Sequence, residues 1–120
     1  MLVVDDEASI RATLRHVLES HRYRVVTAAD GREALNILHQ RLGEIRLVLT
    51  DLMMPLMSGS ALIRAAQVLA PGLKFVAMIG LQNKEQQEEL AKLGVREILM
   101  KPCGPQKVLA ALRRQLPAEV

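Results

Sequence analysis

Short apolar runs alternate along the chain with longer segments in which apolar residues recur at every third or fourth position. The short runs have the length of buried strands, and the longer segments have the period of amphipathic helices. Strands are predicted at Leu2–Val4, Arg24–Ala28, Arg46–Thr50, Lys74–Ile79 and Glu97–Met100. Regular alternation of strand and helix is typical of βα units around a parallel sheet.

Helices are predicted after each strand from their apolar stripes and end signals. The first runs from about Ala8 to Ser20, with Ile10, Leu14, Val17 and Leu18 on one face, and the second follows Asp30, whose side chain can cap it. The third runs from Ser58 to before Pro71, the fourth from Lys84 to Leu93, and the fifth from Pro105 to before Pro117. The fourth has the weakest stripe, Leu90 and Leu93, and the fifth is expected to bury Val108 and Leu112.

Right-handed crossovers leave few arrangements for five parallel strands. The expected fold is α/β, a doubly wound five-stranded parallel sheet of order 2-1-3-4-5, which is a flavodoxin-like (βα)5 architecture. In such sheets ligands bind where the strand order reverses, at the carboxyl ends of strands 1 and 3. Chemistry is therefore expected just after Val4 and Thr50.

Carboxylates follow both of these strand ends. Asp5, Asp6 and Glu7 come after the first strand, and Asp51 comes after the third. Their mutual repulsion is most simply relieved by a hard divalent cation with oxygen ligands, and Mg²⁺ would leave room for a phosphate oxygen. Lys101 follows the fifth strand and brings a positive charge to the same edge. One such aspartate alone is usually a helix cap or turn residue, but three acids and a lysine together indicate a functional site.

Composition narrows the class of protein. The 120 residues are half apolar, which suits one domain over residues 1–120, and no apolar run approaches the roughly 20 residues of a membrane span. We expect a cytoplasmic protein that binds no membrane. The net charge is +3, but the basic residues are dispersed and the only aromatics are Tyr23 and Phe75, which argues against nucleic-acid binding. The single cysteine, Cys103, is expected to be a partly buried thiol.

Four segments together resemble the receiver domain of two-component response regulators, in the family's order and spacing. These are Leu2–Glu7, Ala29–Leu35, Leu49–Pro55 with Gly59, and Met100–Pro102. The resemblance covers essentially the whole chain. The run from Gly43 to Pro55 is also similar to receivers at the carboxyl end of hybrid histidine kinases, although a freestanding receiver or the front of a transcription factor fits equally.

The resemblance implies roles for individual residues. Asp51 would be the phospho-acceptor, Asp6 and Asp51 would bind Mg²⁺ with the Met53 carbonyl, and Asp5 would act through water. Lys101 would contact the phosphoryl group, while Pro55, Gly59 and Gly80 are similar to the family's loop residues, and as residue types are ordinary turn formers. The implied partner is a histidine kinase or a histidine phosphotransfer domain, with self-association or an output domain in a longer chain. The domain would catalyse only its own phosphorylation and dephosphorylation.

Two positions depart from the family pattern. The family's Ser or Thr at the end of strand 4 corresponds to Ile79, and its aromatic residue on strand 5 corresponds to Ile98. No Ser or Thr occurs between Lys74 and Lys101, so the hydroxyl is missing whatever the register. The hypothesis is that Asp51 still accepts phosphate but that the change reaches the surface of the fourth helix weakly or by another route. Alternatively, both positions are ordinary core.

Met53 and Leu81 flank the expected phosphoryl pocket and are apolar. They are predicted to shield the acyl phosphate from water and slow its hydrolysis. The alternative is that both are loop side chains that rest on the core.

Three other functions compete with the phospho-acceptor interpretation. A phosphatase of the haloacid dehalogenase kind needs a second aspartate two residues after the nucleophile, where this chain has Met53. A flavin-binding module needs a phosphate loop after the first strand, where the two acids Asp5 and Asp6 would repel phosphate. A receiver-like interaction module that works without phosphorylation remains open at this point.

Overall fold

A parallel sheet forms the centre of the computed structural model, which describes residues 1–54, 57–80, 84–101 and 103–115. Its strands are β1 (Leu2–Val4), β2 (Val26–Ala28), β3 (Leu47–Asp51), β4 (Lys74–Ile79) and β5 (Glu97–Met100). All neighbouring strands pair in parallel, and the order across the sheet is β2-β1-β3-β4-β5. The predicted fold class and strand order are confirmed.

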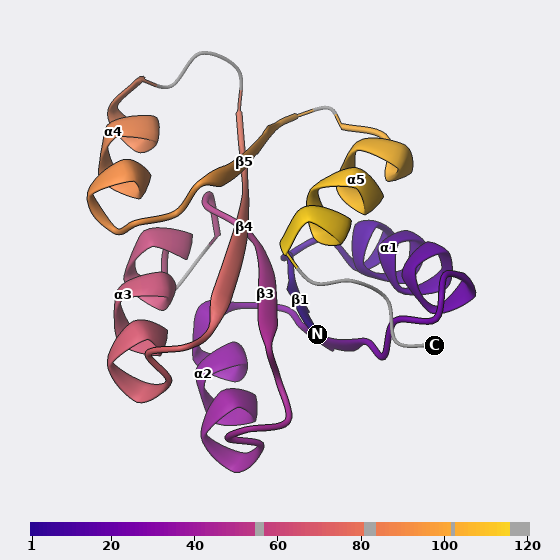
Figure 1. The fold of residues 1–120 in the computed structure, drawn as a ribbon, viewed down its shortest axis with the longest axis horizontal. Helices are drawn as coiled ribbons and strands as arrows, with labels where there is room; N and C mark the ends of the chain where they lie inside the picture. Colours follow the sequence, from indigo (N-terminus) through magenta and orange to yellow (C-terminus); the bar gives the residue numbers. More distant parts are fainter. Residues whose placement is uncertain (55–56, 81–83, 102, 116–120) are drawn as a thin grey trace.

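Helices cover both faces of this sheet (Figure 1). Their bounds are α1 (Ala8–Ser20), α2 (Gly31–Gln40), α3 (Gly59–Leu69), α4 (Lys84–Lys92) and α5 (Pro105–Gln115). Figure 1 shows α1 and α5 together on one face and α2, α3 and α4 on the other. Among the described residues, no helix is both long and apolar enough to cross a membrane.

Side-chain caps set the start of two helices where the sequence predicts them. The Asp30 side chain accepts a hydrogen bond from the Glu33 amide at 2.9 Å, and the Glu33 carboxylate accepts one from the Ala29 amide at 3.2 Å. At α3, the Ser58 hydroxyl oxygen accepts a hydrogen bond from the Ala61 amide at 3.2 Å. These bonds satisfy amides that have no partner within the helix, and so they fix where the chain leaves each strand loop.

Several predicted bounds were wrong by one or two residues. The second strand begins at Val26 rather than Arg24, because β1 starts at Leu2 and Leu2 pairs with Val26. The third strand begins one residue later than predicted and includes Asp51, which pairs with Met78. The fourth helix ends at Lys92 rather than Leu93. The predicted end before Pro117 lies outside the described residues, as do Pro55, Leu81 and Pro102.

Two apolar layers sandwich the sheet, because successive strand residues point to opposite faces. In β1 and β3, Leu2, Val4 and Val48 pack under α2 and α3, whereas Val3 and Leu49 pack under α1 and α5. The predicted helix stripes are confirmed as the facing surfaces. Leu14, Leu18, Leu90, Val108 and Leu112 are buried, and Ile10, Val17 and Leu93 are partly buried. Both faces of the sheet are thus closed, so polar side chains of the sheet lie at the strand ends, and the strand order reverses between β1 and β3 at its carboxyl edge.

Gly59 allows the start of α3 to lie directly against the end of β3. A Cβ atom at this position would lie 2.5 Å from the Asp51 carbonyl oxygen and 2.7 Å from the Leu52 Cα. The Gly59 amide also donates a hydrogen bond to the Leu52 carbonyl at 3.0 Å. Any larger residue must therefore push α3 away from the segment that carries Asp51.

We expect Gly59→Ala to lower the free energy of unfolding by about 1–3 kcal/mol, the usual range for an extra carbon in a filled space. Urea denaturation measures this change. Gly72→Ala is the matched control, because a Cβ there meets nothing within 4 Å. Equal stability of the two variants would show that the backbone contact at Gly59 is not restrictive.

Candidate functional site

Three carboxylates from two neighbouring strand ends converge at one edge of the sheet. Asp5 follows β1 and Asp51 ends β3, and the two strands pair through Val4 and Thr50. One carboxylate oxygen from each of Asp5, Asp6 and Asp51 lies within 4.8 Å of the others. Asp5 and Asp51 are buried, with 0% and 3% of their surface exposed, whereas Asp6 is exposed. The predicted convergence of these acids is confirmed.

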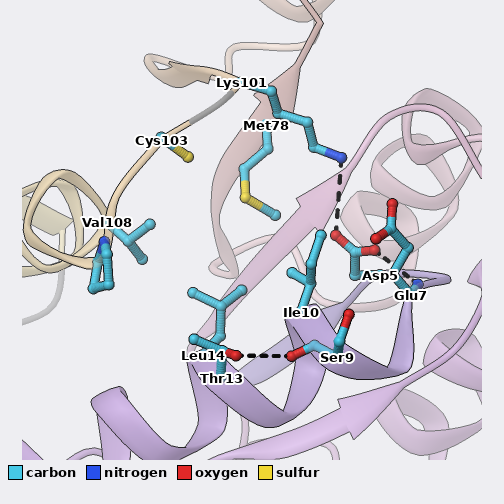
Figure 2. A pocket seen from close by; sticks show the side chains of 11 residues that line it. Asp5, Glu7, Ser9, Ile10, Thr13, Leu14, Met78, Lys101, Cys103 and Val108 are labelled. Carbon is cyan, nitrogen blue, oxygen red and sulfur yellow. Dashed lines mark hydrogen bonds and ion pairs between the residues drawn. The ribbon is translucent and has the colours of Figure 1, made fainter.

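Asp5 is the most buried of the three carboxylates, and one of its oxygens lacks a hydrogen-bond donor among the described residues. Its Oδ1 atom accepts a hydrogen bond from the Glu7 amide at 2.9 Å, but its buried Oδ2 atom has no hydrogen-bond donor among the described residues. The Lys101 ammonium approaches this oxygen only to 4.0 Å. Figure 2 marks this pair with a dashed line. Burial raises the pKa of the Asp5 carboxyl, and the charges of Asp51 and Asp6 raise it further, against the opposing effects of the Glu7 amide and Lys101.

Asp51 makes the closest ion pair in the site. Lys101 Nζ donates a hydrogen bond to Asp51 Oδ2 at 2.6 Å, and the Met53 amide donates to Asp51 Oδ1 at 3.2 Å. The Lys101 amide in turn donates to the Ile79 carbonyl at 2.8 Å, which fixes this lysine at the end of β5. Burial would lower the pKa of the Lys101 ammonium, but the bond to Asp51 and the charges of Asp51 and Asp5 outweigh it and raise that pKa. Lys101 is therefore held protonated beside Asp51.

The donor set fits a hard divalent cation. Carboxylate oxygens are the ligands that Mg²⁺ and Ca²⁺ prefer, and three of them face one small volume here. A buried oxygen without a donor is costly unless a cation or its bound water supplies the missing partner. Asp5 Oδ2 meets that condition, so the residues present fit a metal ion.

The loop after β3 presents Met53 to solvent, with 66% of its surface exposed. The alternative that Met53 rests on the core is therefore wrong, whereas the neighbouring Met54 does pack against the core. The Met53 sulfur accepts a hydrogen bond from Gln86 Nε2 at 3.1 Å. Shielding of an acyl phosphate by Met53 stays a prediction.

Ile79 and Ile98 belong to the same apolar layer. Ile79 is the last residue of β4 and is fully buried, and Ile98 on β5 packs partly buried against the same cluster. Both side chains face the α3 and α4 side of the sheet, in the manner of ordinary core residues. Gly80 follows Ile79 and is exposed. The end of β4 therefore offers no hydroxyl group to the acidic site.

A cavity of about 530 Å³ opens beside the carboxylates, between α1 and α5. Asp5 and Lys101 lie at its polar side, and its apolar wall is formed by Ile10, Leu14, Met78 and Val108 (Figure 2). Cys103 also lines it, and burial raises the pKa of this thiol, which favours its neutral form. The sequence signals missed this cavity, because the α1 stripe indicated only that Ile10 and Leu14 face inward.

Comparisons with known proteins agree with this geometry. A family model described as "Response regulator receiver domain" matches residues 1–113. The "Probable transcriptional regulator ycf27" of Guillardia theta is 34% identical over 116 residues, which cover 97% of this chain and 44% of that protein. "Sensor kinase CckA" of Brucella abortus is 32% identical over 97% of this chain, but only 12% of its own length is matched. The chain thus spans less than half of the length of these two curated relatives.

The fold also closely matches that of a solved structure. Chemotaxis protein CheY4 of Vibrio cholerae superposes with a TM-score of 0.88 at 32% identity, and the match covers 96% of each chain.

The buried Asp5 oxygen that lacks a donor gives a stability test for the metal site. Without divalent cations we expect Asp5→Asn to raise the free energy of unfolding at pH 7 by about 1 kcal/mol, because an amide loses less on burial than a carboxylate. The raised pKa of Asp5 leads to the same expectation. A carboxyl group whose pKa is higher in the folded state stabilises the fold at low pH, and this contribution is lost as the pH rises through the folded pKa. At pH 7 the wild type therefore lacks that contribution.

Mg²⁺ should reduce this difference in stability between the variant and the wild type. At a concentration about tenfold above the dissociation constant, it should stabilise the wild-type chain by roughly 1.4 kcal/mol and the variant by less. Chemical denaturation with EDTA and with Mg²⁺ measures both effects. A variant less stable than the wild type in EDTA would show that the Asp5 charge is already compensated by the protein.

Proposed function

The chain belongs to the receiver domain family of two-component response regulators, and we propose that Asp51 is its phospho-acceptor residue. The observation that carries the proposal is the 2.6 Å bond from Lys101 to a buried Asp51 that shares its site with Asp5 and Asp6. A nucleophilic carboxylate beside a fixed cation, with further acids available to a metal ion, is suited to phosphoryl transfer.

In the proposed reaction, an oxygen of Asp51 attacks the phosphorus atom of a phosphohistidine. The new O–P bond forms as the P–N bond breaks, and the electron pair of that bond stays on the imidazole nitrogen of the partner. Lys101 stabilises the negative charge of the phosphoryl oxygens as a point charge. Bound Mg²⁺, held by Asp6, Asp51 and the Met53 carbonyl with Asp5 acting through water, would neutralise charge on the transferred group.

The proposed donor is a histidine kinase or a histidine phosphotransfer domain, and the proposed receiver unit is residues 1–120. The matched relatives include a transcriptional regulator and a sensor kinase, each longer than this chain. These relatives support an output domain or a hybrid kinase as the setting in which such a receiver works. Self-association of the chain is the other way in which phosphorylation could be passed on.

An interaction module that works without phosphorylation is less favoured. Asp5 is fully buried with one oxygen that lacks a donor, and such a carboxylate costs stability in a site with no ligand. A module of that kind would have no physical need for the cluster.

The direct test is the intact mass of the chain after incubation with acetyl phosphate and Mg²⁺. We expect one added phosphoryl group on the wild type, and none on Asp51→Asn or in the presence of EDTA. Asp51→Asn keeps the size of the side chain and removes the nucleophile. A wild-type chain that gains no mass under these conditions would contradict the proposal.

We also propose that Ile79 lowers the stability of the phosphorylated state. A hydroxyl group at this position could donate a hydrogen bond to a phosphoryl oxygen, and the buried isoleucine cannot. A hydrogen bond to a charged group contributes about 1.5–3 kcal/mol. The missing bond therefore weakens the link between Asp51 and the end of β4.

Ile79→Thr should raise the affinity for beryllofluoride, a phosphoryl mimic, by roughly tenfold or more. Ile79→Val is the matched control, because valine has the shape of threonine without the hydroxyl. Titration of both variants in the presence of Mg²⁺ separates the hydrogen bond from the change in volume. Equal affinity of the two variants would mean that the position does not reach the phosphoryl group.

A further inference from the structure

The N-terminal turn of α4 contacts the loop that follows Asp51. Gln86 lies in this turn, and its Nε2 atom donates a hydrogen bond to Met53 Sδ at 3.1 Å. The Met53 amide donates to Asp51 Oδ1 at 3.2 Å. Two consecutive hydrogen bonds therefore lead from the α4 side chain to the carboxylate that accepts the phosphoryl group.

The other end of α4 is held by α3. Gln67 on α3 donates a hydrogen bond to the Leu93 carbonyl at 2.6 Å, just beyond the last residue of α4. Arg64 on α3 pairs with Glu89 at 3.7 Å, and Leu90 is fully buried in the core. The C-terminal half of α4 thus has its own attachments, independent of Asp51. Its N-terminal turn is the part that can respond to the loop after β3.

We propose that Gln86 is a positioning residue that holds the turn from Asp51 to Met53 and couples its state to the N-terminal turn of α4. This inference rests on the proposed function of Asp51. The coupling runs through Met53 and does not use Ile79 or Ile98, whose side chains pack in the core and have no hydrogen-bonding groups. It therefore gives this chain a route to α4 that needs no hydroxyl at the end of β4.

The chemistry of the contact suits a reversible link. A thioether sulfur is a weak hydrogen-bond acceptor, so the bond between Gln86 and Met53 can break at little cost when the loop moves. The Met53 carbonyl belongs to the same peptide segment as the amide bonded to Asp51, and it is the main-chain metal ligand of the proposed site. Metal binding and the Gln86 contact must then affect each other equally, because coupling between two sites is reciprocal.

A double-mutant cycle on Mg²⁺ affinity tests whether Gln86 holds the turn from Asp51 to Met53 through its bond to Met53. We expect Gln86→Ala and Met53→Leu each to weaken Mg²⁺ binding by about two- to fivefold, and the double variant to weaken it no further than either single variant. Isothermal titration calorimetry gives the dissociation constants. Gln87→Ala is the matched control, since Gln87 is the same residue type at the next position of α4, and it should bind Mg²⁺ like the wild type.

Amide hydrogen exchange tests whether the state of this turn is coupled to the N-terminal turn of α4. With Mg²⁺ and beryllofluoride, the wild-type chain should change its exchange by at least about twofold at Glu88 and Glu89, whose amides bond to the first turn of α4, and Gln86→Ala should lose that change. Exchange from Leu90 to Lys92 should stay the same in both proteins. A merely structural role for Gln86 would alter exchange without ligand but leave the ligand-dependent change intact.

Additive effects in the cycle, or a ligand-dependent change in α4 that survives Gln86→Ala, would overturn this inference alone. Phosphorylation of Asp51 would then still stand. A wild-type chain that binds neither Mg²⁺ nor beryllofluoride would overturn the proposed function together with the inference that rests on it.

Discussion

The ion pair between Lys101 and Asp51 is the interaction around which the site is organised. It joins the carboxyl end of β5 to that of β3, and these two strands are separated in the sheet by β4. The pair forms because the chain follows the order β2-β1-β3-β4-β5, which also brings Asp5 from β1 to the same edge. The strand order that buries both faces of the sheet also gathers these polar side chains, so fold and site depend on the same topology.

One lysine does not balance the charge of this edge. Three carboxylates lie within 4.8 Å, and one ammonium group bonds one of them. Asp5 is the most buried of the three carboxylates, and one of its oxygens has no hydrogen-bond donor among the described residues. A protein under selection for stability alone would not keep such a group, since a neutral side chain of similar size would cost less. The donor set of this edge therefore fits a cation, and the proposed phosphoryl transfer depends on that fit.

Much of this arrangement could be predicted from the sequence, because periodicity encodes which face of an element is buried. The strand order, Asp5, Asp51 and Lys101 all followed from short apolar runs and the polar residue after each. Two features could not be predicted: the Asp5 Oδ2 atom that lacks a hydrogen-bond donor among the described residues, and the cavity between α1 and α5. Both depend on side-chain geometry across separate elements. Gln86 was hidden in the polar face of α4, where one glutamine is indistinguishable from the next. The bounds of β2 depend on pairing with β1, which local sequence does not encode.

The central claim is that the carboxylates of Asp5, Asp6 and Asp51 form a metal site beside a phosphoryl-accepting oxygen. A crystal of the chain grown with Mn²⁺ in place of Mg²⁺, and with beryllofluoride, tests it most directly through the anomalous signal of manganese. We expect one strong anomalous peak within about 2.0–2.5 Å of carboxylate oxygens of Asp6 and Asp51, with beryllofluoride bonded to Asp51 and contacted by Lys101. A manganese peak elsewhere, or an Asp51 that carries no beryllofluoride while the acidic cluster stays without metal, would contradict it.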